Sequence, residues 1–391
     1  SRGLGDVYKR QTISGAEGLS LLAIPFFVCA GIFMNYTGVT KRIMNCCEVL
    51  TARMPGGLAQ VNILLSTLMG GLSGSSLADA AMQCKMLVPT MESKGYSKSF
   101  STVITAASGM VVPLIPPGVG LIIYGCINNI SIGKLFIAGI GPGIVLCVTL
   151  MIFTHFLSKK RGYLPSRTTK IPVSEKIAAV RPAFLPLLLP IIIIGGVRIG
   201  VFTASEAGTV AIVYAVLLGL LYKELTLKNV MQGCKETVTT TASIMLIVAA
   251  ATCFSWILTK EQIPQQFSQW MISNIHNKYV FLIMVNIFLL IVGMFIEGNA
   301  SMIVLAPLLH PVAMAYGIDD IHFAMVYIFN CTIGAFTPPM GTLMFVSCGI
   351  TKCPTKDFIK EAVPFYILFA IDIIVLTYIP QLTTFLVNVF Y

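Results

Sequence analysis

The sequence predicts an all-α polytopic membrane protein, organised as an inverted repeat with two re-entrant hairpins and two helices broken at Pro-Pro pairs. Of its 391 residues, 56% are hydrophobic and 11% are charged, whereas an ordinary soluble domain carries about 25% charged residues. The 26 Lys and Arg residues outnumber the 16 acids, but they fall in short gaps between apolar runs, as in membrane proteins. The composition therefore argues against a soluble enzyme, a nucleic-acid-binding protein and a disordered chain.

The first repeat is expected over residues 15–157. The polar stretch Ser1–Gln11 lacks an initiator methionine and does not match the apolar sequence after it, so residues 1–14 are expected to be a non-native or truncated start. The apolar run Leu19–Asn35 is long enough to cross a bilayer. An amphipathic stretch then leads to a hairpin over residues 58–90.

This hairpin has two apolar arms that meet at the small polar cluster Gly70–Ser76. Each arm is short for a full crossing, and irregular polar backbone at membrane depth is tolerated only inside protein or beside a wet cavity. The next helix, over residues 101–128, contains Pro116-Pro117, which remove two N–H donors and should break it. Lys134–Leu157 forms the return span.

A basic linker over residues 158–182, expected in the cytoplasm, separates the halves, and the second repeat is expected over residues 183–391. This half repeats the order of the first. It begins with spans near Ala183–Val197, Ala207–Tyr222 and Val238–Leu258, followed by an amphipathic segment, Gln262–Ile275. A hairpin over residues 279–316, a helix over residues 323–350 broken at Pro338-Pro339, and a last span, Val363–Val387, complete it.

The two halves share short strings as well as order. Val61-Asn62-Ile63 precedes the first hairpin tip, and Val285-Asn286-Ile287 precedes the second. Coincidence is the alternative explanation, but the shared order of arm, tip, arm and broken helix favours a repeat. When the basic loops are placed in the cytoplasm, the first hairpin enters from the cytoplasm and the second from outside. Such an inverted repeat is typical of secondary transporters.

The hairpin tips and helix breaks are the candidate binding sites. A broken helix offers free carbonyls that suit Na⁺ and free N–H groups that attract carboxylates. The first site would combine Ser73, Gly74, Ser75 and Ser76 with Ile115, Pro116, Pro117 and Gly118. The second would combine Glu297, Gly298, Asn299 and Ser301 with Thr337, Pro338, Pro339 and Met340. The alternative is that the Gly and Ser residues only allow close helix packing.

Three acids lie within apolar segments: Asp79, Glu297 and Asp372. Charged groups at membrane depth are costly and are usually paired or functional. Asp79 either takes part in the site or caps the start of its hairpin arm. Glu297 is a candidate to contact a cation or to carry a proton, and no role is assigned to Asp372. No metal-binding, ATP-binding or nucleophile motif occurs in the sequence.

Several motifs resemble the large membrane subunit of tripartite ATP-independent periplasmic (TRAP) transporters. They are Leu22–Phe27 followed by Ala30-Gly31, Gly71–Ala81, Ile115–Pro117 with Tyr124-Gly125, Ser131–Phe136, and Ile333-Gly334 leading to Thr337–Pro339. The resemblance runs in order from about residue 15 to the end of the chain. Two departures are Gly118, where members often have serine, and Glu297-Gly298-Asn299, where they often have Glu-Thr-Thr.

The resemblance implies an elevator-type transport unit in the bacterial inner membrane. It implies Na⁺-driven import of organic acids such as C4-dicarboxylates or sialic acids, together with a small membrane subunit and a periplasmic substrate-binding protein. Na⁺ would bind at Ser73, Ser75, Asn299, Thr337 and neighbouring carbonyls, with no further cofactor. A stand-alone carboxylate transporter, an integral-membrane enzyme and a purely structural scaffold are the alternatives. The anion, the ion stoichiometry and the oligomeric state stay open.

Overall fold

The computed structural model describes residues 19–167, 169 and 171–391, and every regular element in these ranges is a helix. This confirms the predicted all-α class, whereas the expected non-native start at residues 1–14 lies outside the described residues. The elements are η1 (Leu19–Leu22), α2 (Ala23–Asn35), α3 (Val39–Thr51), α4 (Gly57–Ser73), α5 (Ser76–Ser93), α6 (Lys98–Gly109), α7 (Val119–Asn128), α8 (Ile132–Lys160), α9 (Val173–Arg198), α10 (Ala204–Leu221), α11 (Leu227–Lys260), α12 (Ile263–Asn274), α13 (Lys278–Phe295), α14 (Gly298–Ala315), α15 (Asp320–Gly334), α16 (Thr342–Thr351), α17 (Thr355–Tyr378) and α18 (Gln381–Phe390).

Six of the described helices are long and apolar enough to cross a membrane, or up to eight if two bent helix pairs each count as one span. One bent pair is α2 with α3, and the other is α17 with α18, which are bent by 48°. The last span predicted over Val363–Val387 therefore falls on a bent helix pair. Pro380 lies at the bend, where its ring removes a backbone donor and interrupts the helix.

The segment predicted as a linker between the two halves contains the ends of two helices. Helix α8 ends at Lys160 and helix α9 begins at Val173, so Pro182 lies within α9. Pro172 precedes the first residue of α9, with a backbone φ of −62°. A proline is tolerated at a helix start because the first N–H groups have no partner within the helix.

Both hairpins have the predicted form of two helices joined at a short tip. In the first, α4 ends at Ser73 and is followed by the capping residue Gly74, whose φ of +62° suits a residue without a side chain. Ser75 then caps α5 by accepting a hydrogen bond from the N–H of Ala78. In the second hairpin, Glu297 caps α14 by accepting from the N–H of Ala300. Each tip therefore ends in a capped helix N-terminus.

Both broken helices are also present. Between α6 and α7 the chain is irregular from Met110 to Gly118, and between α15 and α16 from Ala335 to Gly341. Each irregular segment contains the predicted Pro-Pro pair, which cannot donate backbone hydrogen bonds to continue a helix.

The two halves share a side-chain hydrogen bond in repeat register. The hydroxyl of Ser108 on α6 donates to Oδ1 of Asn62 on α4, at 3.1 Å. The side-chain amide of Asn330 on α15 donates to Oδ1 of Asn286 on α13, at 2.8 Å. Asn62 and Asn286 each belong to one copy of the Val-Asn-Ile string. The repeated sequence therefore makes equivalent side-chain contacts in the two halves.

The two hairpins open toward opposite ends of the molecule. The first opens beside the end of α8, where the N–H of Gly56 donates to the carbonyl of Tyr163. The start of α17 lies at the same end, because Arg161 pairs with Glu361. The second hairpin opens at the other end of α17, where the hydroxyl of Tyr378 donates to the carbonyl of Tyr279.

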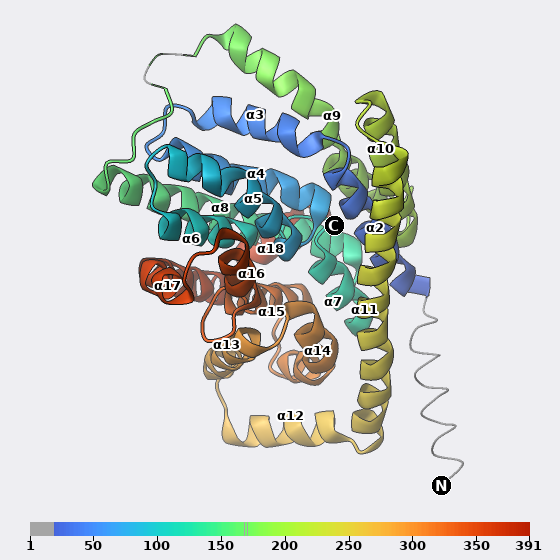
Figure 1. Cartoon of the computed structure of the whole chain (residues 1–391). Coiled ribbons are helices and arrows are strands. Elements are labelled where there is room, and N and C mark those ends of the chain that lie inside the picture. Colours follow the sequence, from blue (N-terminus) through green and yellow to red (C-terminus); the bar gives the residue numbers. More distant parts are fainter. Residues whose placement is uncertain (1–18, 168, 170) are drawn as a thin grey trace.

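The two repeats also interlock. Figure 1 shows α4, α5, α6 and α8 stacked on α13–α17, with the long α11 along one side and α12 across its end. Within the stack, α5 packs against α16 and α14 packs against α7. The second arm of each hairpin therefore packs on the second half of the broken helix from the other repeat.

Candidate functional site

The two hairpin tips meet at one cavity of about 430 Å³. Its walls come from both tips, from the broken helices and from α2 and α11. The side chains that give it polar character are Asn35, Ser73, Ser75, Ser76, Thr239, Thr240, Ser243, Glu297, Asn299, Thr332 and Thr342. None of the described lining residues is Lys, Arg or His. The site therefore offers hydroxyl, amide and backbone groups with one carboxyl group.

Glycines bring the first tip against the first helix break. A Cβ on Gly74 would lie 2.8 Å from the carbonyl oxygen of Pro117, and one on Gly71 would lie 3.3 Å from that of Pro116. The N–H of Val119, at the start of α7, donates to the carbonyl of Gly74 at 3.4 Å. The structure thus brings the first tip together with Pro116 and Pro117, which the sequence assigned to the same site.

The serines of the first tip retain oxygen lone pairs. The hydroxyl of Ser73 donates to the carbonyl of Met69 at 3.2 Å, which leaves its oxygen able to accept. Ser75 accepts from the N–H of Ala78 at 3.4 Å, and Ser76 begins α5. All three serines line the cavity. Their oxygens are ligands that suit a small hard cation.

The second tip faces the opposite repeat. Oε2 of Glu297 accepts from the N–H of Ala300 at 3.1 Å, and Glu297, Gly298 and Asn299 all line the cavity. A Cβ on Gly120 of α7 would lie 3.9 Å from Oδ1 of Asn299. The tip therefore lies beside α7, the second half of the first broken helix, in keeping with the packing of α14 on α7.

Ser301 and the Pro-Pro pairs lie outside the cavity lining. The buried hydroxyl of Ser301 lies 3.2 Å from the hydroxyl of Tyr327, and the hydroxyl of Thr337 donates to the carbonyl of Ile333 at 2.8 Å. The segments Ile115–Gly118 and Thr337–Met340 are likewise absent from the described lining.

After each helix break, the first residues of the following helix line the cavity. Val119 and Gly120 begin α7 and line the cavity, and so does Thr342, the first residue of α16. The capping positions Gly118 and Gly341 provide no side-chain hydrogen bond. The first N–H groups of both helices therefore lack a side-chain acceptor at the cap, an arrangement that favours an anion.

Six polar lining residues were missed by sequence reasoning: Asn35 on α2, Thr239, Thr240 and Ser243 on α11, Thr332 on α15 and Thr342 on α16. A signal was present in the letters, because three threonines and a serine within five residues are unusual inside an apolar span. Polar side chains within a membrane helix usually face protein or a wet cavity. The threonine and serine cluster alone does not show which other segments it faces, because the hairpin tips lie far away in the sequence.

The other two intramembrane acids lie away from the cavity. The buried carboxylate of Asp79 accepts through Oδ2 from the hydroxyl of Ser66 at 2.6 Å and from the amide of Gln83 at 2.8 Å. Asp79 does not cap α5, so that alternative is wrong, because the cap belongs to Ser75. Asp372 accepts from the hydroxyl of Thr149 at 3.0 Å.

Comparison with known proteins places this architecture in a family. The sequence matches, over residues 4–382, the family described as "Tripartite ATP-independent periplasmic transporter, DctM component". The sialic acid TRAP transporter large permease protein SiaM of Vibrio cholerae is 40% identical over 382 residues, which cover 97% of this chain and 89% of that protein. The C4-dicarboxylate TRAP transporter large permease protein DctM of Pseudomonas aeruginosa is 36% identical over 374 residues, covering 95% and 87%.

A solved structure shares the fold. The YdaH transporter of Alcanivorax borkumensis is similar with a TM-score of 0.63 and 14% sequence identity, covering 97% of this chain and 89% of that one. At this level of identity the likeness concerns the fold alone. These three proteins are named as transporters or permeases, and none of the three is named as an enzyme.

Proposed function

This chain belongs to the DctM-component family of tripartite ATP-independent periplasmic transporters, and from that premise we propose that it imports an organic acid by Na⁺ symport across the bacterial inner membrane. The acid belongs to the class of C4-dicarboxylates or sialic acids, which are named in the titles of its relatives. The proposal includes a small membrane subunit and a periplasmic substrate-binding protein as partners, as the family description suggests.

The observation that carries the proposal is the convergence of four helix N-termini on a cavity whose described lining contains no cationic side chain. These are the N-termini of α5, α7, α14 and α16. Each helix N-terminus carries a partial charge of roughly +0.5. Two of the four lack a capping side chain. The N–H groups of Val119 and Leu343 already donate to backbone carbonyls, so it is the positive ends of these two helices as a whole that favour a carboxylate.

Sodium ions provide the remaining positive charge. The oxygens of Ser73, Ser75 and Asn299 and the nearby backbone carbonyls form an oxygen-rich environment, which is what Na⁺ requires. Glu297 adds negative charge at the second tip. An organic anion entering this cavity alone would face that charge, whereas bound Na⁺ reverses the local balance. Coupling follows because each ligand favours binding of the other.

We propose that transport proceeds by an elevator motion. The reciprocal packing of α5 on α16 and of α14 on α7 makes the hairpins and broken helices one block. Helices α2 and α11 form the opposing wall of the cavity, so the substrate would lie between block and wall. The amphipathic helices α3 and α12 connect the two parts along the chain. Sliding of the block past the wall would expose the cavity to each side in turn.

The test is Na⁺-driven uptake into proteoliposomes that contain the complete transporter with its small subunit and binding protein. Ser75→Leu and Ser76→Leu should abolish uptake, because bulky apolar side chains would fill the cavity at the first tip, while membrane insertion stays intact. Leu77→Met, a volume-conserving change next to them, is the control. Uptake that is unchanged by removal of Na⁺, or by both serine substitutions, would contradict the proposal.

A further inference from the structure

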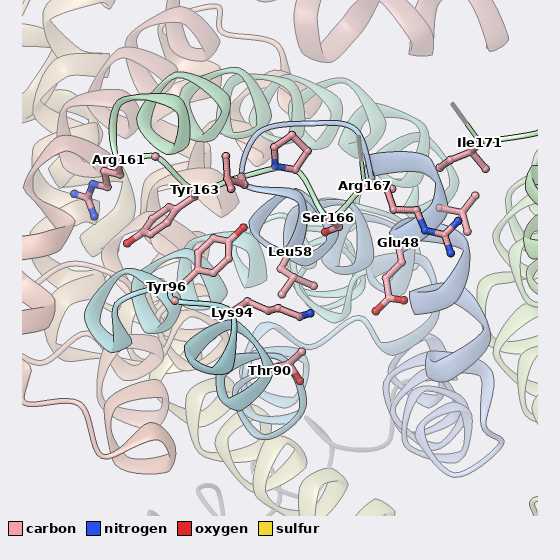
Figure 2. Close-up of a pocket in the computed structure, with 16 residues that line it drawn as sticks. Glu48, Leu58, Thr90, Lys94, Tyr96, Arg161, Tyr163, Ser166, Arg167 and Ile171 are labelled. Carbon is pink, nitrogen blue, oxygen red and sulfur yellow. The ribbon is translucent and has the colours of Figure 1, made fainter. Parts of the chain in front are cut away.

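A second cavity, of about 680 Å³, lies at the end of the molecule where the first hairpin opens. Its lining comes from α3, from Leu58 of α4, from the end of α5 and its connection to α6, and from residues 161–167 and 171 between α8 and α9 (Figure 2). We propose that this cavity binds the headgroup of a phosphoethanolamine phospholipid, with the phosphate at Lys94 and the ammonium group at Glu48. The distinctive feature is the opposed pair of charges.

Two of the four charged lining residues, both arginines, are already paired with groups elsewhere. Arg161 pairs with Glu361 and lies over the ring of Phe100. Arg167 pairs with Glu175. These two cations are therefore largely neutralised by partners that lie outside the cavity lining.

Lys94 and Glu48 are different. Within the described ranges, neither side chain forms an ion pair or a hydrogen bond with another residue. Figure 2 shows the two side chains extending toward one another from opposite sides of the cavity. The cavity thus presents one unpaired cation and one unpaired carboxylate. A ligand carrying a single charge would match only one of them, whereas a zwitterion matches both.

The surrounding groups distinguish the two ends of such a ligand. Ser166, from the segment after α8, adds a hydroxyl group to the lining, whereas the hydroxyl of Thr90 already donates to the carbonyl of Met86 at 3.2 Å. Hydroxyl and ammonium groups are donors to phosphate oxygens. Glu48 is an acceptor for the three N–H bonds of a primary ammonium group. A quaternary ammonium group has no N–H to donate, so phosphocholine should bind less well than phosphoethanolamine.

The apolar surface beside the cavity points to a lipid as the source of this headgroup. Leu164, which lines the cavity, is 79% exposed, and Leu50 on α3 is 48% exposed. At the start of α9, two residues beyond the lining residue Ile171, Val173 is 69% exposed. Apolar side chains next to a charged pocket fit the acyl chains of an interfacial lipid. A soluble phosphoethanolamine compound would leave them in water.

The position of the cavity places the bound lipid between segments that would move during transport. The cavity joins the first hairpin to α3 and to the segment that leads into α9. If transport is an elevator motion, as in the proposed function, the bound lipid spans parts that move relative to one another. It should therefore change the maximal rate of uptake and leave the Na⁺ and substrate dependence intact.

The binding experiment is native mass spectrometry of the purified protein with phosphatidylethanolamine, phosphatidylcholine and phosphatidylglycerol of matched acyl chains. We expect about tenfold stronger retention of phosphatidylethanolamine than of either other lipid, which is the effect of one charged hydrogen-bonded pair. Glu48→Gln should remove the preference over phosphatidylcholine, and Lys94→Gln should weaken retention of all three. Lys159→Gln, an exposed residue at the same end of the molecule, is the matched control.

Several outcomes would overturn the inference. Stronger retention of phosphatidylglycerol would show an anionic-lipid site, and equal effects of Lys94→Gln and Lys159→Gln would show that the cavity is not the site. Equal competition by soluble glycerophosphoethanolamine would exclude the lipid as the ligand. Because retention is measured without transport, failure of lipid binding stays separate from failure of the proposed Na⁺ symport. Glu48→Gln preserves side-chain volume, and circular dichroism checks that the variant stays folded.

Discussion

The contact between Gly74 and Pro117 allows a sharp test of the first ion site. In Gly74→Ala the new Cβ would lie 2.8 Å from the carbonyl oxygen of Pro117 and 3.3 Å from the nitrogen of Val119. The residue also has a φ of +62°, which costs a residue with a side chain about 1–2 kcal/mol. Both effects push the first tip away from the break that it contacts.

Gly317→Ala separates these two effects. Gly317 has a φ of +67°, and a Cβ there would meet nothing within 4 Å. Both variants carry the same backbone cost, but only Gly74→Ala adds the close contact. Overpacking of this kind costs about 1–3 kcal/mol. If the ion-bound state carries that cost, the apparent Na⁺ affinity falls by about 5- to 150-fold.

The assay is a Na⁺ titration of substrate uptake in proteoliposomes, together with the midpoint of thermal unfolding of each variant. Gly317→Ala should lower the unfolding midpoint and leave the half-saturating Na⁺ concentration unchanged. Gly74→Ala should raise that concentration by the stated factor. Equal Na⁺ dependence in the two variants would refute the reasoning, because the tip would then have no energetic link to ion binding.

Three further predictions concern other parts of the molecule. Asn286→Ala removes hydrogen bonds to Asn330 and Thr377 and should lower stability by about 1–3 kcal/mol; an unchanged unfolding midpoint in detergent would contradict this. Glu297→Gln removes the carboxylate charge from the cavity and should weaken Na⁺-driven uptake more than it changes the unfolding midpoint; uptake at the wild-type rate would argue against an electrostatic role. A membrane-impermeant thiol reagent applied from outside should label Asp320→Cys and not Arg167→Cys, and the reverse labelling pattern would invert the predicted topology.

Local chemistry made most of the architecture predictable. Pro116-Pro117 and Pro338-Pro339 cannot donate backbone hydrogen bonds, so both helix breaks follow from the residues themselves. The long apolar runs require helices because a bilayer satisfies no free backbone group. The bend within the last span was not predicted: it lies at Pro380, near the end of an apolar run.

The partners within the site were decided by packing between distant segments. Ser301 belongs to the second tip in the sequence, yet it turns to Tyr327 and away from the cavity. Asn299 lies beside Gly120 of the other repeat, and α11 brings Thr240 to the same cavity. None of these neighbours is close along the chain, and hydropathy carries no information about which helix faces which. Where the chain must break and expose polar backbone follows from its residues alone, because those are local properties of residues and solvent. Which exposed groups meet depends on how the interlocked repeats pack, and hydropathy along the chain does not contain that information.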